Sequence, residues 1–195
     1  MSKAAATRQL ILEQAFELVY RNGYQATSID HIIATTQVTK GAFFYHFKTK
    51  DEMGLAMINE VMYPGMYETL VRPLTNAEDP VKEIYSMMKG ILLGNPFFVV
   101  AYGCPAINLV EEMAPINEGF KNALLKLMTQ WHEAIRQCVS RGIANGRVRK
   151  DVNAKQVAYF ITAGYGGVRN MGKLLGAASY QTYLKELKNY LSGLA

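Results

Sequence analysis

The chain has 195 residues, 50% of them hydrophobic, and a formal net charge of +5. This length allows a full hydrophobic core in one or two helical units, and two cysteines are too few for a disulfide framework. The start of the chain lacks the apolar stretch of a signal peptide, and the longest apolar run, residues 97–101, is too short to span a bilayer. We therefore expect a cytoplasmic protein without a membrane partner.

The basic residues are denser in the first quarter of the chain. Residues 1–50 hold 6 of the 21 lysines and arginines but only 3 of the 16 acidic residues, so this part carries a net charge of +3. A modest basic excess is typical of a protein that binds a particular DNA site, and it falls short of the charge of a protein that coats DNA.

A first helix is predicted from Thr7, a candidate N-cap, to about Asn22. Its apolar residues recur at the spacing of one buried face, and they are Leu12, Ala15, Phe16 and Val19. The small and polar residues before Thr7 are expected to be disordered. Gly23 suits the left-handed position that ends a helix.

Two short helices joined by a tight turn are predicted next. Thr27 can cap the first of them, with Asp30 as the partner of a capping box. The polar and β-branched residues 35–38 extend a helix poorly and predict a turn. Thr39 then caps a second helix, Lys40 to about His46.

The second of these helices has two different faces. At about 100° per residue, Ala42 and Phe43 point towards the core. The opposite face carries a cation, a bare backbone and two aromatic rings: Lys40, Gly41, Phe44 and Tyr45. Such a face suits the major groove of DNA, where a lysine reaches guanine acceptors or phosphates, a glycine permits close approach and apolar atoms contact thymine methyl groups. The alternative is a solvated amphipathic helix pair that happens to carry lysines.

Groups beside this face are candidates for contacts with the DNA backbone. Lys48 and Lys50 follow the helix Lys40–His46. Thr49 with Glu52 forms a capping box that opens the next helix, whose N-terminus is positive. The residues predicted to contact DNA are Thr27, Ser28, Thr39, Lys40, Gly41, Phe44, Tyr45, His46 and Lys50.

The block VTKGAFFYHFKTKDE spans residues 38–52. With the helices before it, over residues 7–53, this block resembles the N-terminal domain of the tetracycline-repressor (TetR) family of bacterial regulators. The resemblance implies a helix-turn-helix that binds double-stranded operator DNA. Two positions depart from the family pattern. Phe44 stands where the family usually has Tyr, so a hydroxyl contact to phosphate is missing, and Gln37 stands where the turn often has Gly, so a left-handed conformation would carry a small cost.

The rest of the chain reads as further helices, which predicts the all-α class with about nine helices and no convincing sheet. Residues 97–103 are strand-like, but without a partner strand they are interpreted as a buried connection or a helix entry. We expect a DNA-binding domain of residues 1–50 and a ligand-binding and dimerisation domain of residues 51–195. The predicted helices after the first three run from Thr49 to about Pro73, Asp79 to Gly94, Cys104 to Met113, Ile116 to Asn145, Asn153 to Leu175, and Ser179 to Leu191. Thr49, Asp79 and Asn153 are the predicted N-caps of their helices.

Glycines are frequent near the end of the chain, at Gly164, Gly166, Gly167, Gly172 and Gly176. A glycine inside a helix costs about 1 kcal/mol relative to alanine, so we expect these residues to permit close approach of another helix. The family resemblance implies a homodimer in which the last two helices of each chain form a four-helix bundle. The residues assigned to this interface are Gly164, Gly167, Met171, Tyr183 and Leu187.

Cys104 lies in the segment YGCPAINLVEEM, which resembles the GCxxxNLxxE segment of family members that respond to electrophiles or oxidants. The matching residues are Gly103, Cys104, Asn108, Leu109 and Glu112, with Pro105 where Leu is more usual. A thiol at a helix N-terminus is stabilised as the thiolate. The alternative is a buried cysteine that only fills space, which is also the interpretation of Cys138.

Methionine and aromatic residues are dense between residues 53 and 131, and methionine adapts to irregular apolar ligands. The resemblance implies a pocket for a small-molecule effector in this region, although most of these side chains serve the core. The candidates for lining the pocket or sensing the effector are Cys104, Met57, Tyr63, Met88, Phe98, Tyr102 and Trp131.

An enzyme is the main alternative class. His31, His46 and His132 do not cluster at the spacing of metal ligands, and the chain contains no HExxH, GxSxG or P-loop motif. We therefore expect no enzymatic activity, metal or cofactor. A third class is a DNA-packaging protein without a ligand, which the large and weakly charged C-terminal part disfavours.

Overall fold

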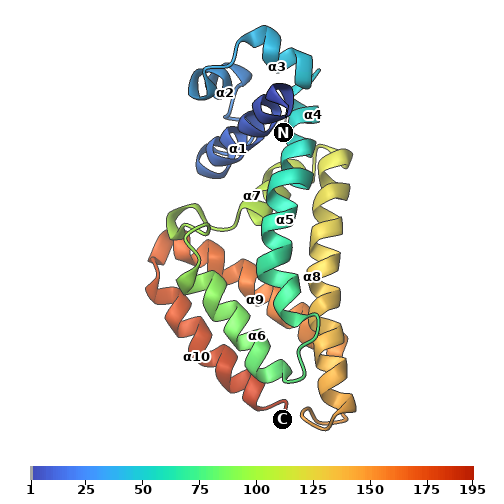
Figure 1. Ribbon diagram of the computed structural model, residues 1–195. Coiled ribbons are helices and arrows are strands. Elements are labelled where there is room, and N and C mark those ends of the chain that lie inside the picture. The colour runs from blue at the N-terminus through green and yellow to red at the C-terminus, as the bar shows by residue number, and fades with distance from the viewer. Residues whose placement is uncertain (1) are drawn as a thin grey trace. The chain divides into compact units, whose positions relative to one another are not determined.

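The computed structural model describes residues 2–195. These residues form α-helices, short π-helical and 3-10 turns, and connections, and no strand occurs among them (Figure 1). The predicted all-α class is confirmed. No helix in this part of the chain is long and apolar enough to cross a membrane.

The chain divides into two compact units. The first comprises the N-terminal residues up to Gly65 together with Pro105–Lys126, so the helix-turn-helix shares its unit with a segment that follows much later in the sequence. Its helices are α1 (Lys3–Asn22), α2 (Ile29–Thr36), α3 (Lys40–His46), α4 (Lys50–Met57), the π-helical turn Ile58–Met62, most of α5 (Tyr63–Met66), α7 (Pro105–Met113) and the first part of α8 (Glu118–Ala144). The division into domains at residue 50 stays a prediction.

The second unit comprises Met66–Cys104 and Leu127–Ala195. Residues 97–103 form a connection with one 3-10 turn, Val100–Tyr102, and no strand. The expected burial is only partial, because Phe98 and Gly103 are the buried residues of this connection. The other elements of this unit are the π-helical turn Tyr67–Val71, the 3-10 turn Arg72–Leu74, α6 (Pro80–Lys89), its π-helical continuation Gly90–Gly94, the rest of α8, α9 (Ala154–Leu175) and α10 (Ala178–Ser192).

Four predicted N-caps are confirmed, because in each the side-chain oxygen accepts a hydrogen bond from a backbone N–H of the first turn. They are Thr39, Thr49, Asp79 and Asn153. The prediction at Thr7 is wrong, because α1 already begins at Lys3, where Ser2 accepts from the N–H of Ala5. The alanines that follow Lys3 have high helix propensity, which explains why this stretch is helical rather than disordered.

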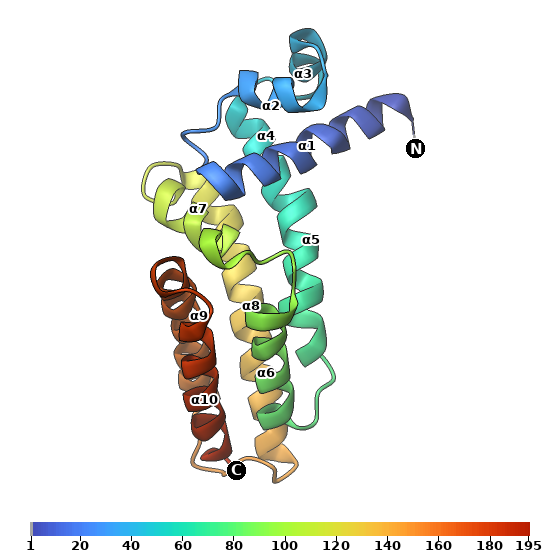
Figure 2. The same ribbon diagram turned by 90° about the vertical axis from the view of Figure 1, so that its left-hand side faces the viewer.

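Helices α9 and α10 run side by side, and two glycines of α9 allow them to approach closely (Figures 1 and 2). A Cβ atom added at Gly164 would lie 2.6 Å from the Tyr183 hydroxyl oxygen, and one at Gly172 would lie 2.4 Å from the Tyr180 ring. Close packing of α9 against α10 within one chain therefore explains why glycine, a poor helix former, occupies these two positions. Gly176 does not lie inside the helix, because it follows α9 with a φ of 74°.

Arg169 of α9 is completely buried in the second unit. Its guanidinium donates hydrogen bonds to the carbonyl oxygen of Gly103, at 2.5 Å, and to the hydroxyl of Tyr180, at 3.3 Å. The same group lies over the ring of Phe98, 5.0 Å from its centroid. A buried charge requires such partners, so Arg169 fixes the turn that precedes Cys104 against α9.

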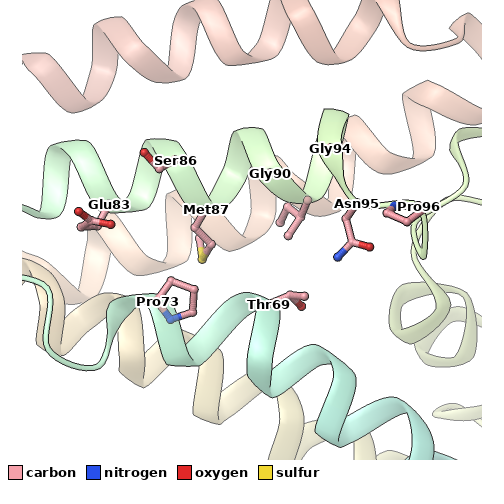
Figure 3. Close-up of a pocket in the computed structure, with 10 residues that line it drawn as sticks. Thr69, Pro73, Glu83, Ser86, Met87, Gly90, Gly94, Asn95 and Pro96 are labelled. Carbon is pink, nitrogen blue, oxygen red and sulfur yellow. The ribbon is translucent and has the colours of Figure 1, made fainter.

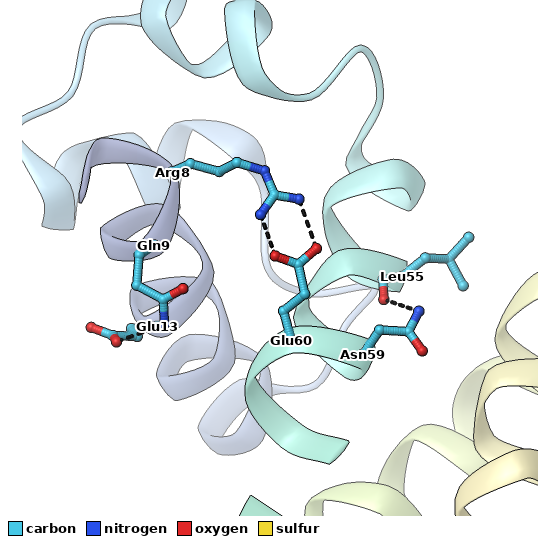
Figure 4. Close-up of polar contacts among 6 residues, drawn as sticks. All are labelled: Arg8, Gln9, Glu13, Leu55, Asn59 and Glu60. Carbon is cyan, nitrogen blue, oxygen red and sulfur yellow. Dashed lines mark hydrogen bonds and ion pairs between the residues drawn. The ribbon is translucent and has the colours of Figure 1, made fainter. Parts of the chain in front are cut away.

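In the first unit an ion pair joins α1 to the helical segment after α4 (Figure 4). The Arg8 guanidinium donates two hydrogen bonds to the Glu60 carboxylate, the one from Nη2 to Oε1 at 2.8 Å. These hydrogen bonds hold the pKa of Glu60 below its usual value. The guanidinium carbon also lies 5.0 Å from the ring centroid of Phe47, at the end of α3. The ion pair therefore connects α1 and the segment after α4 to the end of the helix-turn-helix.

Candidate nucleic-acid interface

The turn between α2 and α3 is built around Gln37, which ends α2 with φ of 55° and ψ of 17°. It is the one residue other than glycine with a positive φ among residues 2–195. The prediction that this position would need a left-handed conformation is confirmed. Ile32 and Phe43 are fully buried below the turn, so both helices are anchored to the core of the unit through their inner faces.

The outer face of α3 carries the four residues predicted for it. Lys40 and Gly41 are exposed, and Phe44 and Tyr45 retain 37% and 73% of their accessible surface. Apart from its chain neighbours and the backbone of its own helix, no described atom lies within 4 Å of the position that a Cβ atom at Gly41 would occupy. The face therefore offers one ammonium group, an uncovered stretch of backbone and two aromatic rings to a partner.

The cations around this face are lightly held. Lys40 Nζ lies 3.1 Å from Asp30 Oδ1, with both side chains largely exposed. An exposed pair of this kind contributes little to stability, so a DNA group can replace Asp30 at small cost. Lys48 is exposed and donates from Nζ to the carbonyl oxygen of Phe44 at 3.4 Å. His46 is half-buried beside the ring of Tyr45.

Thr27 has a different position from the one predicted. It is buried, and its hydroxyl donates to the carbonyl oxygen of Gly23 at 2.7 Å, so this side chain neither caps α2 nor faces solvent. Ser28 is the N-cap instead, accepting from the N–H of His31 at 3.1 Å, and it is exposed. Two adjacent hydroxyl residues can both cap a helix, and the sequence pattern alone does not separate them.

Lys50 is also held within the protein. Its ammonium group donates to the carbonyl oxygen of Tyr24 at 2.6 Å and lies 4.3 Å from the centroid of the Tyr24 ring. Burial lowers the pKa of Lys50. A phosphate contact from Lys50 would require this side chain to turn away from Tyr24.

The residues predicted to line a ligand pocket are distributed over both units. Met57 and Tyr63 belong to the first unit, and the other five belong to the second. Met57, Met88, Phe98, Cys104 and Trp131 are buried, and Tyr63 and Tyr102 are half-buried. Burial fits both of the predicted roles, core packing and pocket lining, so it does not separate them.

A groove of about 470 Å³ opens elsewhere in the second unit, between α6 and the segment before it (Figure 3). Figure 3 shows Met87 pointing across it towards Pro73, with Glu83 near one end and Asn95 near the other. The residues that line it are Thr69, Pro73, Glu83, Ser86, Met87, Gly90, Ile91, Gly94, Asn95 and Pro96. Two π-helical turns border it, a feature frequent at functional sites. The pocket prediction was based on methionine and aromatic residues. It did not identify this groove, because most of the residues that line the groove are small or polar.

The predicted dimerisation residues fall into two groups. Gly167 and Met171 lie on an exposed face of α9, which also carries Tyr159, Phe160 and Leu174. Leu187 is only 2% exposed, because it belongs to the inward stripe of α10, so it packs within its own chain and the prediction of an interface position is wrong. Gly164 and Tyr183 meet each other inside the chain.

Comparison with known proteins decides the family. The family model for bacterial regulatory proteins of the tetR family matches residues 11–57, and the model for the tetracyclin repressor-like C-terminal domain matches residues 96–186. An uncharacterized HTH-type transcriptional regulator of Lactococcus lactis subsp. lactis is 31% identical over 134 residues, which cover 69% of this chain and 68% of that protein. The chain belongs to the TetR family.

A more distant relative matches in sequence, and a solved structure shares the fold over almost the whole length. The HTH-type transcriptional repressor NemR of Escherichia coli K12 is 23% identical over 142 residues, 72% of this chain and 69% of NemR. A crystal structure of a TetR transcriptional regulator from Chloroflexus aurantiacus superposes with a TM-score of 0.89 at 27% identity, covering 98% of this chain and 97% of that one. The fold of a TetR-family helix-turn-helix regulator is therefore established for this chain.

Proposed function

We propose that this protein is a repressor that binds a pseudo-palindromic operator as a homodimer and leaves it when an effector binds, in the cytoplasm. The observation that carries the proposal is the outer face of α3, where Lys40, Gly41 and Tyr45 are exposed on a helix whose other side is buried. A short helix with this face fits the major groove, and its bare glycine lets the backbone come close to the bases.

Two lysines should separate base reading from backbone contact. Lys40→Ala should lower operator affinity by about 1–3 kcal/mol and relax the preference at one base position. Lys48→Ala should weaken binding to all sequences alike and reduce the dependence of affinity on salt, as loss of a phosphate contact does. Fluorescence anisotropy with operator and mismatched duplexes measures both. Unchanged affinity in both variants would argue against α3 as the reading helix.

The effector is proposed to be a small apolar or electrophilic molecule, and two features of the structure support candidate sites for it. The groove beside α6 is lined by Met87 and Ile91, and Glu83 is the one charged residue among the described residues of its wall. An apolar molecule whose hydrogen-bond donor or positive group faces Glu83 would fit this chemistry.

The second place is Cys104, which lies directly before α7. It is 1% exposed, so modification would add volume to a packed interior, which tolerates added volume badly. The similarity to NemR supports this alternative. The solved E. coli NemR structure is described as the reduced form, which distinguishes a redox state of that protein.

Treatment with N-ethylmaleimide should release operator DNA from the wild-type protein but not from Cys104→Ser. Cys138→Ser should respond like the wild type, because burial raises the pKa of the Cys138 thiol to about 11 and leaves little reactive thiolate at neutral pH. Gel-shift assays with and without reagent measure the release. Equal release from wild type and Cys104→Ser would leave the reversible ligand as the signal.

A further inference from the structure

Glu112, near the end of α7, grips the backbone that joins α1 to α2. Its Oε2 accepts a hydrogen bond from the N–H of Tyr24 at 2.8 Å, and its Oε1 accepts from the N–H of Gln25 at 2.6 Å. Both carboxylate oxygens therefore bind consecutive amides of the linker, Gly23–Ser28, that leads into the helix-turn-helix. Hydrogen bonds to an ionised acceptor are stronger than those between neutral groups.

The linker backbone is shaped to receive this carboxylate. Gly23 has a φ of 91°, and a Cβ atom placed there would lie 3.3 Å from Glu112 Oε2. A larger residue would be strained by its backbone and would press on the carboxylate. A negative charge in the last turn of a helix is itself unfavourable with respect to the helix dipole, so the position of Glu112 costs helix stability that the two hydrogen bonds offset.

A cation holds the opposite side of the same linker. While Glu112 accepts from the amides of Tyr24 and Gln25, the Lys50 ammonium donates to their carbonyl oxygens, at 2.6 Å and 3.4 Å. The negative charge of Glu112 favours the charged form of Lys50 and so opposes the lowering of its pKa by burial. Glu112 and Lys50 thus form a clamp of opposite charges around the backbone of Tyr24 and Gln25.

The Tyr24 side chain extends the clamp to α4 and α8. Its hydroxyl donates to Asp51 Oδ1 at 2.7 Å, and Asp51 Oδ2 accepts from Asn117 Nδ2 at 3.0 Å. The Tyr24 ring packs edge-on against Phe120, with centroids 4.8 Å apart. Gly54 makes room for both rings, since a Cβ there would lie within 2.7 Å of each. All these residues belong to the first compact unit.

We propose that Glu112 is a positioning residue for DNA recognition, which holds the reading helices α2 and α3 in the arrangement that fits the operator. This proposal rests on the proposed function. Glu112 belongs to α7 and not to the proposed DNA-binding face of α3, so it acts on DNA recognition through the linker. Ser28, the cap of α2, follows the clamped amides by three residues, and the Thr27 hydroxyl binds back to Gly23, so the linker conformation sets where α2 begins.

The test compares two neighbouring carboxylates in α7. Glu112→Gln keeps the shape of the side chain but replaces one acceptor by an amide group that cannot accept from a linker N–H. Glu111→Gln makes the same change of net charge on the same turn of α7, at an exposed position. Each variant and the wild type are titrated with an operator selected by the wild type from random DNA and with a random duplex. The ratio of the two affinities is compared, since partial loss of folded protein cancels in it.

Glu112→Gln should lower the ratio of operator to random-duplex affinity roughly tenfold relative to Glu111→Gln, as expected for the loss of charge-assisted hydrogen bonds. Hydrogen exchange at the amides of Tyr24 and Gln25 should accelerate in Glu112→Gln while exchange in α9 stays unchanged. The positioning role would be overturned if Glu112→Gln and Glu111→Gln had the same ratio of affinities. It would also be overturned if exchange at the Tyr24 and Gln25 amides were no faster in Glu112→Gln than in the wild type. A wild type that does not prefer its selected operator would instead defeat the proposed function, so the two failures are distinguishable.

Discussion

Gly41→Leu should abolish most sequence-specific DNA binding while leaving the protein at least as stable as before. Space is open around Gly41, because no described atom beyond its chain neighbours and its own helix backbone lies within 4 Å of a Cβ placed there. A leucine also improves helix propensity by about 0.8 kcal/mol. In a complex the same side chain would stand between α3 and the floor of the major groove. We expect an operator affinity lower by about 2–3 kcal/mol, roughly 30- to 150-fold.

The matched control is Gly65→Leu. Gly65 also lies in an exposed helical position with open space around it, outside the helix-turn-helix. Thermal unfolding should show two variants as stable as the wild type, and anisotropy titration should separate them. If Gly41→Leu bound the operator as tightly as Gly65→Leu, α3 could not be the helix that enters the groove.

Gly167→Leu should convert the proposed homodimer to a monomer. Gly167 lies on the exposed face of α9 beside Met171, which is 51% exposed. If association depended only on apolar area, the added leucine would strengthen it. If the two α9 helices must approach closely, the same leucine keeps them apart, so the sign of the effect decides between the two accounts. A monomer would also lose the gain from binding two half-sites at once, which is worth about 10²–10⁴ in affinity.

Sedimentation at micromolar concentration measures the first effect and operator titration the second. Apart from its chain neighbours and the backbone of its own helix, no described atom lies within 4 Å of a Cβ placed at Gly167, so the fold of the single chain should be unaffected. A stable dimer of Gly167→Leu would contradict close approach at this position. A wild type that sediments as a monomer at the same concentration would contradict the proposed assembly as a whole.

Local signals carried the predictions that the structure confirms. A capping residue such as Thr39 or Asn153 acts on amides two or three residues away, and the inward position of Phe43 follows from helical periodicity, so both can be recognised in a short stretch of sequence. The left-handed conformation of Gln37 was expected from the family resemblance, because this turn position is often Gly in the family. These features define the helix-turn-helix almost completely.

Long-range partners explain what the sequence did not reveal. Lys50 was expected to face DNA, and its ammonium group is held by carbonyl groups 25 and 26 residues earlier. The two amides that Glu112 binds are 88 and 87 residues away. The sequence does not show that Arg169 is buried, because its hydrogen-bond partner Gly103 is 66 residues away in the chain. A periodicity argument also gives the inward face of α10 without saying whether its partner is α9 or a second chain, which is why Leu187 was misassigned.

Selection of bound duplexes from a pool of random DNA by the wild-type protein, followed by footprinting, tests the central claim most directly. Two identical reading heads related by a two-fold axis should enrich one inverted repeat whose half-sites lie about one helical turn apart, or slightly more, and protect both. Recovery of no preferred sequence, with protection in no fixed register, would contradict a sequence-specific regulator and indicate a protein that only coats DNA.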